Sequence, residues 1–259
     1  MPNQITTGEV KELRDMTGIS VMQCKRALEE AEGDMKKALA ILKKTSSDIA
    51  LKKINREVKD GRVAIKTSGN KAVLISLHCE TDFVARNEDF IKLLETLADK
   101  ALKDGVEKMT IEAKDVIYPI IQKTGENIQL GVVCEIFGDV LGSYTHNNKI
   151  AVIVSLERGN AELGRDIAMH IAAMKPEYIT DTEITADAKK TMLEVFKKEI
   201  ANEDKPAEIK EKILLGKMAT YFKEKTLLDQ IFIKDGDMTV GQLLEKNNAK
   251  IKEVKIYSI

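Results

Sequence analysis

The residues of this sequence that are best suited to chemistry are its three histidines and three cysteines. His78 and Cys79 are adjacent and come shortly before Asp82, so the three could supply the base, nucleophile and acid of a small enzyme. Adjacent residues of a strand point to opposite faces, which makes His78 and Cys79 a poor pair of metal ligands. His146 and His170 are isolated in sequence, and an isolated histidine is more often structural than catalytic.

No signature of catalysis accompanies these residues. The sequence contains no P-loop, dinucleotide-binding or zinc-protease pattern. Cys24, Cys79 and Cys134 are odd in number and far apart, which favours a reducing compartment, the cytoplasm. We therefore expect no enzyme, no metal, no cofactor and no nucleotide bound by this chain itself. An enzyme that depends on Cys79 is the alternative, and loss of activity in Cys79→Ser would support it.

The amino-acid composition limits the classes of partner that we expect for this protein. Its 41 Lys and Arg residues are balanced by 42 Asp and Glu residues, so charge gives no reason to expect a nucleic acid or an anionic membrane. There is no apolar run long enough for a transmembrane helix. Residues 1–4 lack the features of a secretory signal. An RNA- or ribosome-associated binding module remains the alternative, and a steep salt dependence of RNA binding would favour it.

The segment Cys79–Asn87 joins a strand to a helix, and Phe83 and Val84 are apolar where polar residues are usual. Phe83 could pack on Ile91 in the first turn of that helix as a hydrophobic staple. Alternatively, it could be an aromatic side chain displayed for a protein partner. Asp82 has a structural alternative too, a hydrogen bond to nearby backbone amides.

The first part of the chain predicts three short helices. The three helices would begin at capping side chains: Thr6 with Glu9, Ser20 with Gln23, and Asp34. The first two would end at Gly18 and Gly33. Helices this short are marginal alone and must pack together, so we expect a compact three-helix module. The polar stretch Lys44–Asp48 predicts the start of a linker after it.

Beyond this module the sequence predicts two similar α+β arrangements. The apolar segments Asn70–Leu77 and Lys149–Leu156 match at an offset of 79 residues, and an amphipathic helix follows each. A further helix is predicted at Ile111–Gln122, perturbed by Pro119. The fold class is therefore α+β, with two related subdomains that each contain a small antiparallel sheet covered by helices.

The segment Ala186–Lys225 carries dense charge of both signs with recurring apolar residues, and it predicts an inserted helical hairpin, an antiparallel coiled coil. Its turn is expected at Asn202–Pro206, and a last strand near Val254–Tyr257. The predicted boundaries are 1–54 for the helical module, 55–140 for the first subdomain, and 141–259 for the second, with the hairpin at about 184–227.

Several segments together resemble one known family. They are Leu13–Leu28, Cys79–Arg86, Gly125–Ile128, Gly138–Tyr144, Ile167–His170, Lys175–Tyr178 and Thr239–Leu244. In this order they closely resemble the motifs of the elongation factor Ts family, over nearly the whole chain. The sequence departs from the family pattern at Ser76 and His78, where Glu and Asn are usual, and at Thr124, where an apolar residue is common.

The resemblance implies both an architecture and a partner. The family has a ubiquitin-associated-like (UBA-like) three-helix module, two α+β core subdomains and an inserted coiled coil. Its members are guanine-nucleotide exchange factors that promote release of GDP from elongation factor Tu during polypeptide elongation. The module and the first subdomain would grip the G domain of elongation factor Tu, and the second subdomain would reach its C-terminal β-barrel.

The resemblance also assigns residues to the contact surface. Thr81, Asp82, Phe83 and Val84 would disturb the partner's Mg²⁺ site. In that group Phe83 would wedge between helices of the G domain, with Asp82 as a polar contact beside it. Further contacts would come from Met22, Lys25, Gly125 and His146, while Cys24 would lie in the core of the module.

Overall fold

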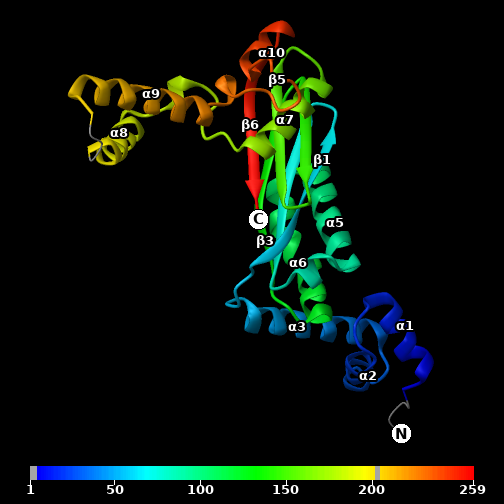
Figure 1. Ribbon diagram of the computed structural model, residues 1–259. Helices are drawn as coiled ribbons and strands as arrows, with labels where there is room; N and C mark the ends of the chain where they lie inside the picture. Colours follow the sequence, from blue (N-terminus) through cyan, green and yellow to red (C-terminus); the bar gives the residue numbers. More distant parts are fainter. Residues whose placement is uncertain (1–4, 202–204) are drawn as a thin grey trace. The chain divides into compact units, whose positions relative to one another are not determined.

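The computed structural model describes residues 5–201 and 205–259 and confirms the α+β class, with two three-stranded antiparallel sheets and associated helices (Figure 1). The chain divides into two compact units, which are described separately. The first holds the chain up to Phe137 together with Thr145–Ala151 and Lys255–Ile259, and the second holds Gly138–Tyr144 and Val152–Val254. The domain boundaries expected near residues 54 and 140 remain predictions.

The three predicted N-terminal helices are present, and they begin at the predicted caps. Thr6 and Glu9 form a reciprocal capping box, and the side chains of Ser20 and Asp34 each accept a backbone N–H of the following turn. Cys24 is completely buried in the core shared by these helices, as predicted. The helices are α1 (Thr7–Thr17), α2 (Val21–Glu30) and α3 (Met35–Lys53).

The linker predicted at Lys44–Asp48 is wrong, because α3 continues through it to Lys53. Ser46 lies inside this helix and is buried. Its hydroxyl has polar partners there, because the Oγ donates to the carbonyl oxygen of Leu42 and bonds the side chain of Gln122 on α6 (Val106–Thr124). The packing of α3 on α6 therefore supplies partners that the polar sequence does not reveal.

The first sheet has the order β1-β2-β3, and its central strand is the buried strand predicted from the sequence. Strands β1 and β2 form a hairpin around Gly69, and α5 covers the inner face of the sheet together with α6. Asn87 caps α5 as predicted. The elements are β1 (Asp60–Ser68), β2 (Lys71–Cys79), α4 (Asp82–Ala85), α5 (Glu88–Asp104) and β3 (Ile128–Phe137).

Ser76, one departure from the family pattern, lies at an irregularity in this sheet. The pairing register of β2 and β3 shifts between Ile75 and Leu77, so Ser76 faces a β-bulge. The Ser76 Oγ accepts the backbone N–H of Val132 at 2.7 Å. Gly131 lies so close that a Cβ there would overlap the side chain of Ser76. The small polar residue therefore fits the bulge sterically and satisfies its backbone.

Helix α6 begins earlier than expected and continues through Pro119, whereas the prediction placed its start at Ile111. Gly105, at a φ of 94°, separates it from α5. The helix ends at Gly125, whose φ of 77° is the left-handed conformation of a C-terminal cap. This end of α6 leads directly to the residues that support the candidate site.

The second sheet repeats the plan of the first, with the order β4-β5-β6. In both sheets a hairpin is followed by helices, and the chain then returns to add a third strand beside the second. Strands β2 and β5 begin at Lys71 and Ile150, which agrees with the predicted repeat. The elements are β4 (Val140–His146), β5 (Ile150–Glu157), α7 (Ala161–Met174), α10 (Val240–Lys246) and β6 (Lys250–Ser258).

The predicted helical hairpin lies between α7 and β6 and consists of α8 (Ala186–Ala201) and α9 (Ala207–Lys225). The two helices pack through an edge-to-face contact of Phe196 and Tyr221, with ring centroids 5.7 Å apart. Residues 202–204 of the predicted turn lie outside the described residues. Short 3₁₀ helices flank the hairpin at Asp181–Glu183 and Leu227–Asp229.

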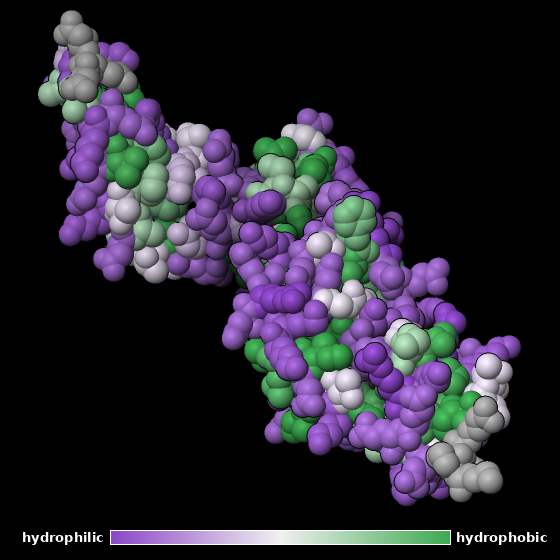
Figure 2. Space-filling model, turned by 90° about the horizontal axis from the view of Figure 1, so that it is seen from below, coloured by the Kyte–Doolittle hydropathy of each residue, from purple (hydrophilic) through white to green (hydrophobic). Residues whose placement is uncertain are grey.

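The helices of the described ranges are all too short or too polar to cross a lipid bilayer. On the face shown in Figure 2, hydrophobic residues form separate patches between hydrophilic ones. Such patches are candidate contact surfaces for other proteins.

Candidate functional site

The predicted loop Thr81–Val84 follows β2 after one residue, Glu80, and its last three residues begin the short helix α4. Thr81 has an extended backbone, with a φ of −131°, and its Oγ accepts the N–H of Val84 at 3.4 Å. This is an N-cap, so the loop has a defined conformation rather than an irregular one.

Phe83 points away from the protein and is 82% exposed. The alternative of a staple packed on Ile91 is therefore wrong, because a packed phenylalanine would be largely buried. Its neighbours behave differently, since Ala85 is buried and Val84 packs against the core of the first unit. The loop is thus anchored at its C-terminal end while it displays one aromatic ring.

The carboxylate of Glu126 holds the start of this loop. Its Oε2 accepts the backbone N–H groups of Glu80 and Thr81, at 3.1 and 3.0 Å. Its Oε1 accepts the hydroxyl of Thr81 at 2.6 Å. Three hydrogen bonds accepted by one carboxylate therefore join the segment after α6 to the loop.

The side chain of Glu80, just before the loop, in turn binds the segment that contains Glu126. The Glu80 Oε1 accepts the backbone N–H of Asn127 at 2.6 Å and lies 3.5 Å from the guanidinium of Arg56. The Asn127 side chain donates to the carbonyl oxygen of Arg56 at 2.7 Å. The predicted site did not include Glu80, Glu126 or Asn127. Glu126 and Asn127 lie in the Gly125–Ile128 motif. Their hydrogen bonds to Glu80 and Thr81 join residues far apart in the sequence, so no local pattern predicts them.

Asp82 does not bond the nearby backbone, as its structural alternative proposed, but pairs with Arg86 at 3.1 Å. Both residues line a polar cavity of about 680 Å³ that also includes Asp60 and Lys149. Burial raises the pKa of Asp60, but hydrogen bonds from Lys149 and the Gly61 amide outweigh it and lower the pKa below its usual value. The cavity therefore contains paired acids and bases next to Phe83.

His146 and Gly125 each adjoin, in sequence, a residue that lies beside the Phe83 loop. His146 is exposed at the end of β4, next to Asn147, a residue that lines the polar cavity together with Asp82. The amide of Asn147 lies 3.2 Å from the His146 Nε2. Gly125 immediately precedes Glu126, and its carbonyl oxygen accepts the amino group of Lys53.

Met22 and Lys25 lie on α2, among the N-terminal helices. Met22 is 60% exposed and neighbours exposed Val21, while Lys25 pairs with Glu29 at 3.7 Å. Among the described residues, no hydrogen bond or ion pair joins Met22 or Lys25 to the Phe83 loop. The two groups are therefore separate parts of the predicted surface.

The geometry disfavours the alternative of a cysteine enzyme. Burial, with the charge of Glu126, raises the pKa of Cys79 to about 12, and its thiol donates to the carbonyl oxygen of Thr81 at 3.1 Å. Burial lowers the pKa of His78, and the charge of Lys149 lowers it further. The His78 ring lies 3.0 Å from the hydroxyl of Tyr257. Within the described ranges, no group of three potential ligands could hold a metal ion.

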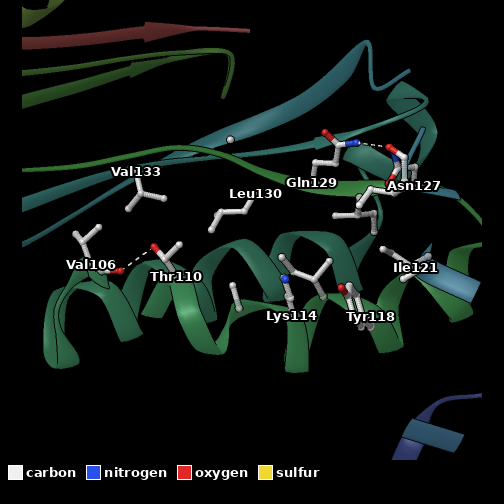
Figure 3. A pocket seen from close by; sticks show the side chains of 15 residues that line it. Val106, Thr110, Lys114, Tyr118, Ile121, Asn127, Gln129, Leu130 and Val133 are labelled. Carbon is white, nitrogen blue, oxygen red and sulfur yellow. Dashed lines mark hydrogen bonds between the residues drawn. The ribbon is translucent and has the colours of Figure 1, made fainter. Parts of the chain in front are cut away.

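A groove of about 670 Å³ lies between α6 and β3 (Figure 3). Val106, Thr110 and Lys114 reach into it from the helix, opposite Leu130 and Val133 of the strand. The amide groups at one end of the groove are already used, because Asn127 and Gln129 donate to backbone carbonyl oxygens. Its mostly apolar lining lacks the convergent acids and bases of an active site.

Comparisons with known proteins agree with the motifs and the fold. A family model described as Elongation factor TS matches residues 80–259. The chain is 39% identical to Elongation factor Ts of Hahella chejuensis (strain KCTC 2396) over 262 residues, which cover 98% of this chain and 92% of that protein. It is 38% identical to Elongation factor Ts of Pseudomonas syringae pv. tomato (strain ATCC BAA-871 / DC3000) over 263 residues, 99% of this chain and 91% of that protein. The chain therefore belongs to the elongation factor Ts family.

Proposed function

We propose that this protein is a guanine-nucleotide exchange factor for elongation factor Tu, and that it acts by binding without covalent chemistry. The observation that carries the proposal is the exposed ring of Phe83 on an anchored loop. Exposing a large aromatic ring to water is unfavourable, and such a ring is a suitable anchor for a protein partner. The cytoplasm is the expected place of this activity.

In this proposal the Thr81–Val84 loop enters the G domain of elongation factor Tu. Phe83 inserts between helices, and Asp82 makes a polar contact at the same surface. The displaced helices no longer hold Mg²⁺ and the phosphates of GDP in their binding geometry. GDP then leaves, and binding of GTP releases the factor.

The energetics require more than one side chain. A thousandfold faster release of GDP requires about 4 kcal/mol of transition-state stabilisation. Burial of one phenylalanine supplies roughly 1.5–3 kcal/mol, part of which is lost in distorting the partner. An interface of about 1,600 Å² would supply the remainder.

Further contacts therefore support the loop. Met22 and Lys25 would dock the N-terminal helices on the G domain, and Gly125 and His146 would contribute near the loop. The second core subdomain would reach the C-terminal β-barrel of elongation factor Tu. No nucleic acid, membrane or cofactor takes part in this proposal.

The direct test is release of a fluorescent GDP from elongation factor Tu, followed by stopped flow after mixing with the factor. Phe83→Ala should slow release at saturating factor by about tenfold or more, because the wedge is lost, and weaken assembly only modestly. Ile111→Ala is a matched control. Ile111 is 73% exposed on α6, roughly 20 Å along the helix from Gly125, so its loss should not change the rate.

Two results would contradict the proposal. If the wild-type protein did not accelerate GDP release, the exchange activity itself would be rejected. If Phe83→Ala matched the wild type in rate, the wedge role of Phe83 would be rejected.

A further inference from the structure

We propose that Glu126 is a positioning residue for exchange, which keeps Phe83 in the orientation that enters the partner. The inference rests on the proposed function, because it concerns the same loop. Glu126 lies 45 residues after Thr81 in the sequence, but its carboxylate accepts the Thr81 hydroxyl directly.

The first argument is the placement of the three hydrogen bonds. Glu126 binds the backbone N–H of Glu80 and of Thr81, the two residues that precede α4. It also binds the hydroxyl of Thr81, which caps this helix. Phe83 is the second residue of α4, so the direction of its Cα–Cβ bond follows from the backbone that Glu126 fixes.

The second argument concerns the proton of the Thr81 hydroxyl. A threonine hydroxyl has one proton to donate and two lone pairs that accept. Donation to Glu126 at 2.6 Å directs that proton away from α4, so a lone pair remains for the N–H of Val84. Without the carboxylate the hydroxyl would be free to rotate, and the cap would be weaker.

The third argument is that α4 cannot order itself. A helix of four residues is far below the length at which a helix is stable in water. Hydrogen bonds to an ionised carboxylate are roughly twice as strong as neutral ones, so Glu126 is a suitable external support. An ordered loop loses less conformational entropy when Phe83 binds the partner, which favours a fast release of GDP.

Gly125 has a definite part in this arrangement. Its left-handed φ of 77° ends α6 and turns the chain, so that Glu126 follows at the turn and meets the loop. The Thr124 hydroxyl accepts the N–H of Glu126 at 3.4 Å, which also supports this turn. We therefore assign Gly125 a conformational role in addition to any contact with the partner.

The test compares Glu126→Ala and Glu126→Gln with the wild type in the stopped-flow assay, over a range of factor concentrations. Glu126→Ala removes three hydrogen bonds and should lower the maximal rate of GDP release by about tenfold or more, since one charge-assisted hydrogen bond is alone worth about that factor. The half-saturating concentration should change less than about threefold. Glu126→Gln keeps one oxygen for the two backbone amides, so its rate should be intermediate. Glu112→Gln is the control, because Glu112 lies on α6 and, in the part of the chain that the structure describes, pairs only with Lys100.

A double substitution separates positioning from general stability. If Glu126 acts through Phe83, then Glu126→Ala should slow release very little further when Phe83 is already alanine. Circular dichroism and thermal unfolding establish that each variant is folded, and Glu126→Gln carries the test if Glu126→Ala does not fold.

The possible failures are distinguishable. An equal loss of rate from Glu126→Ala in both backgrounds, or an effect on the half-saturating concentration alone, would overturn the positioning role while leaving the exchange function intact. A Glu126→Ala variant as fast as the wild type would also overturn it. A wild-type protein without exchange activity would overturn this inference together with the proposed function.

Discussion

His170 is fully buried in the second unit and uses both of its ring nitrogens. Its Nδ1 accepts the backbone N–H of Ile233 at 3.2 Å, so the proton of the neutral ring is on Nε2, which donates to Gln230 at 2.9 Å. The expectation that an isolated histidine is structural is confirmed for this residue. A second ring proton on Nδ1 would break the bond to Ile233.

This geometry predicts a pH dependence of stability. Burial lowers the pKa of His170, although the hydrogen bond to Gln230 opposes the shift. The unfolded chain then binds a proton more readily than the folded one, so stability is complete above the ordinary pKa of about 6.5 and is lost as the pH falls below it. We expect the free energy of urea unfolding to be about 1 kcal/mol lower at pH 5.5 than at pH 7.5.

The matched variant is His170→Gln, which lacks the titrating ring. Its free energy of unfolding should change less between the same two pH values than that of the wild type. The same pH dependence in both proteins would show that His170 does not control it.

At the scale of elements, strand β4 and helix α7 approach closely through two glycines. Gly142 of β4 faces Gly164 of α7, and a Cβ on Gly142 would overlap the backbone of Gly164. Two backbones can pack this closely only where neither residue has a side chain. The motif Gly138–Tyr144 is apparent in the sequence, but its packing partner Gly164 is not.

Gly142→Ala should therefore destabilise the second unit, by about 2–3 kcal/mol, because the added methyl group pushes α7 away from the sheet. Urea unfolding followed by circular dichroism measures the change. Gly216→Ala is the control, since Gly216 lies in α9 with open space around its Cα. Alanine there should stabilise the helix by roughly 0.5–1 kcal/mol. Equal effects of the two substitutions would contradict the packing argument.

The elements also show which local signals are reliable. The predicted caps at Thr6, Ser20, Asp34 and Asn87 are all present, because a cap depends on residues within a few positions. The end of α3 was misplaced because the burial of Ser46 depends on distant Gln122.

At the scale of the whole molecule, the proposed activity is a coupling between two ligands of elongation factor Tu. If the factor weakens GDP binding, GDP must weaken binding of the factor by the same ratio. Stabilising the transition state of GDP release by about 4 kcal/mol requires that a large part of the interface form only as GDP leaves, and not already in the GDP-bound complex.

The reciprocal effect can be measured by titration calorimetry or surface binding. The dissociation constant of the factor should be larger for GDP-bound than for nucleotide-free elongation factor Tu. The ratio should equal the ratio of GDP dissociation constants measured with and without saturating factor. Unequal ratios would indicate an additional bound species, and equal affinity in both states would exclude the proposed mechanism.

The sequence by itself determined the type and order of most elements, the repeat of the two sheets, the helical hairpin and the family. These features depend on alternation, capping and motif order, all of which are local or collinear with the chain. The tertiary structure decided that Phe83 faces solvent, that Glu126 holds Thr81, and that Ser76 fits a bulge beside Gly131. Each of these depends on atoms far apart in sequence, whose approach is set by packing and hydrogen bonding rather than by any local pattern.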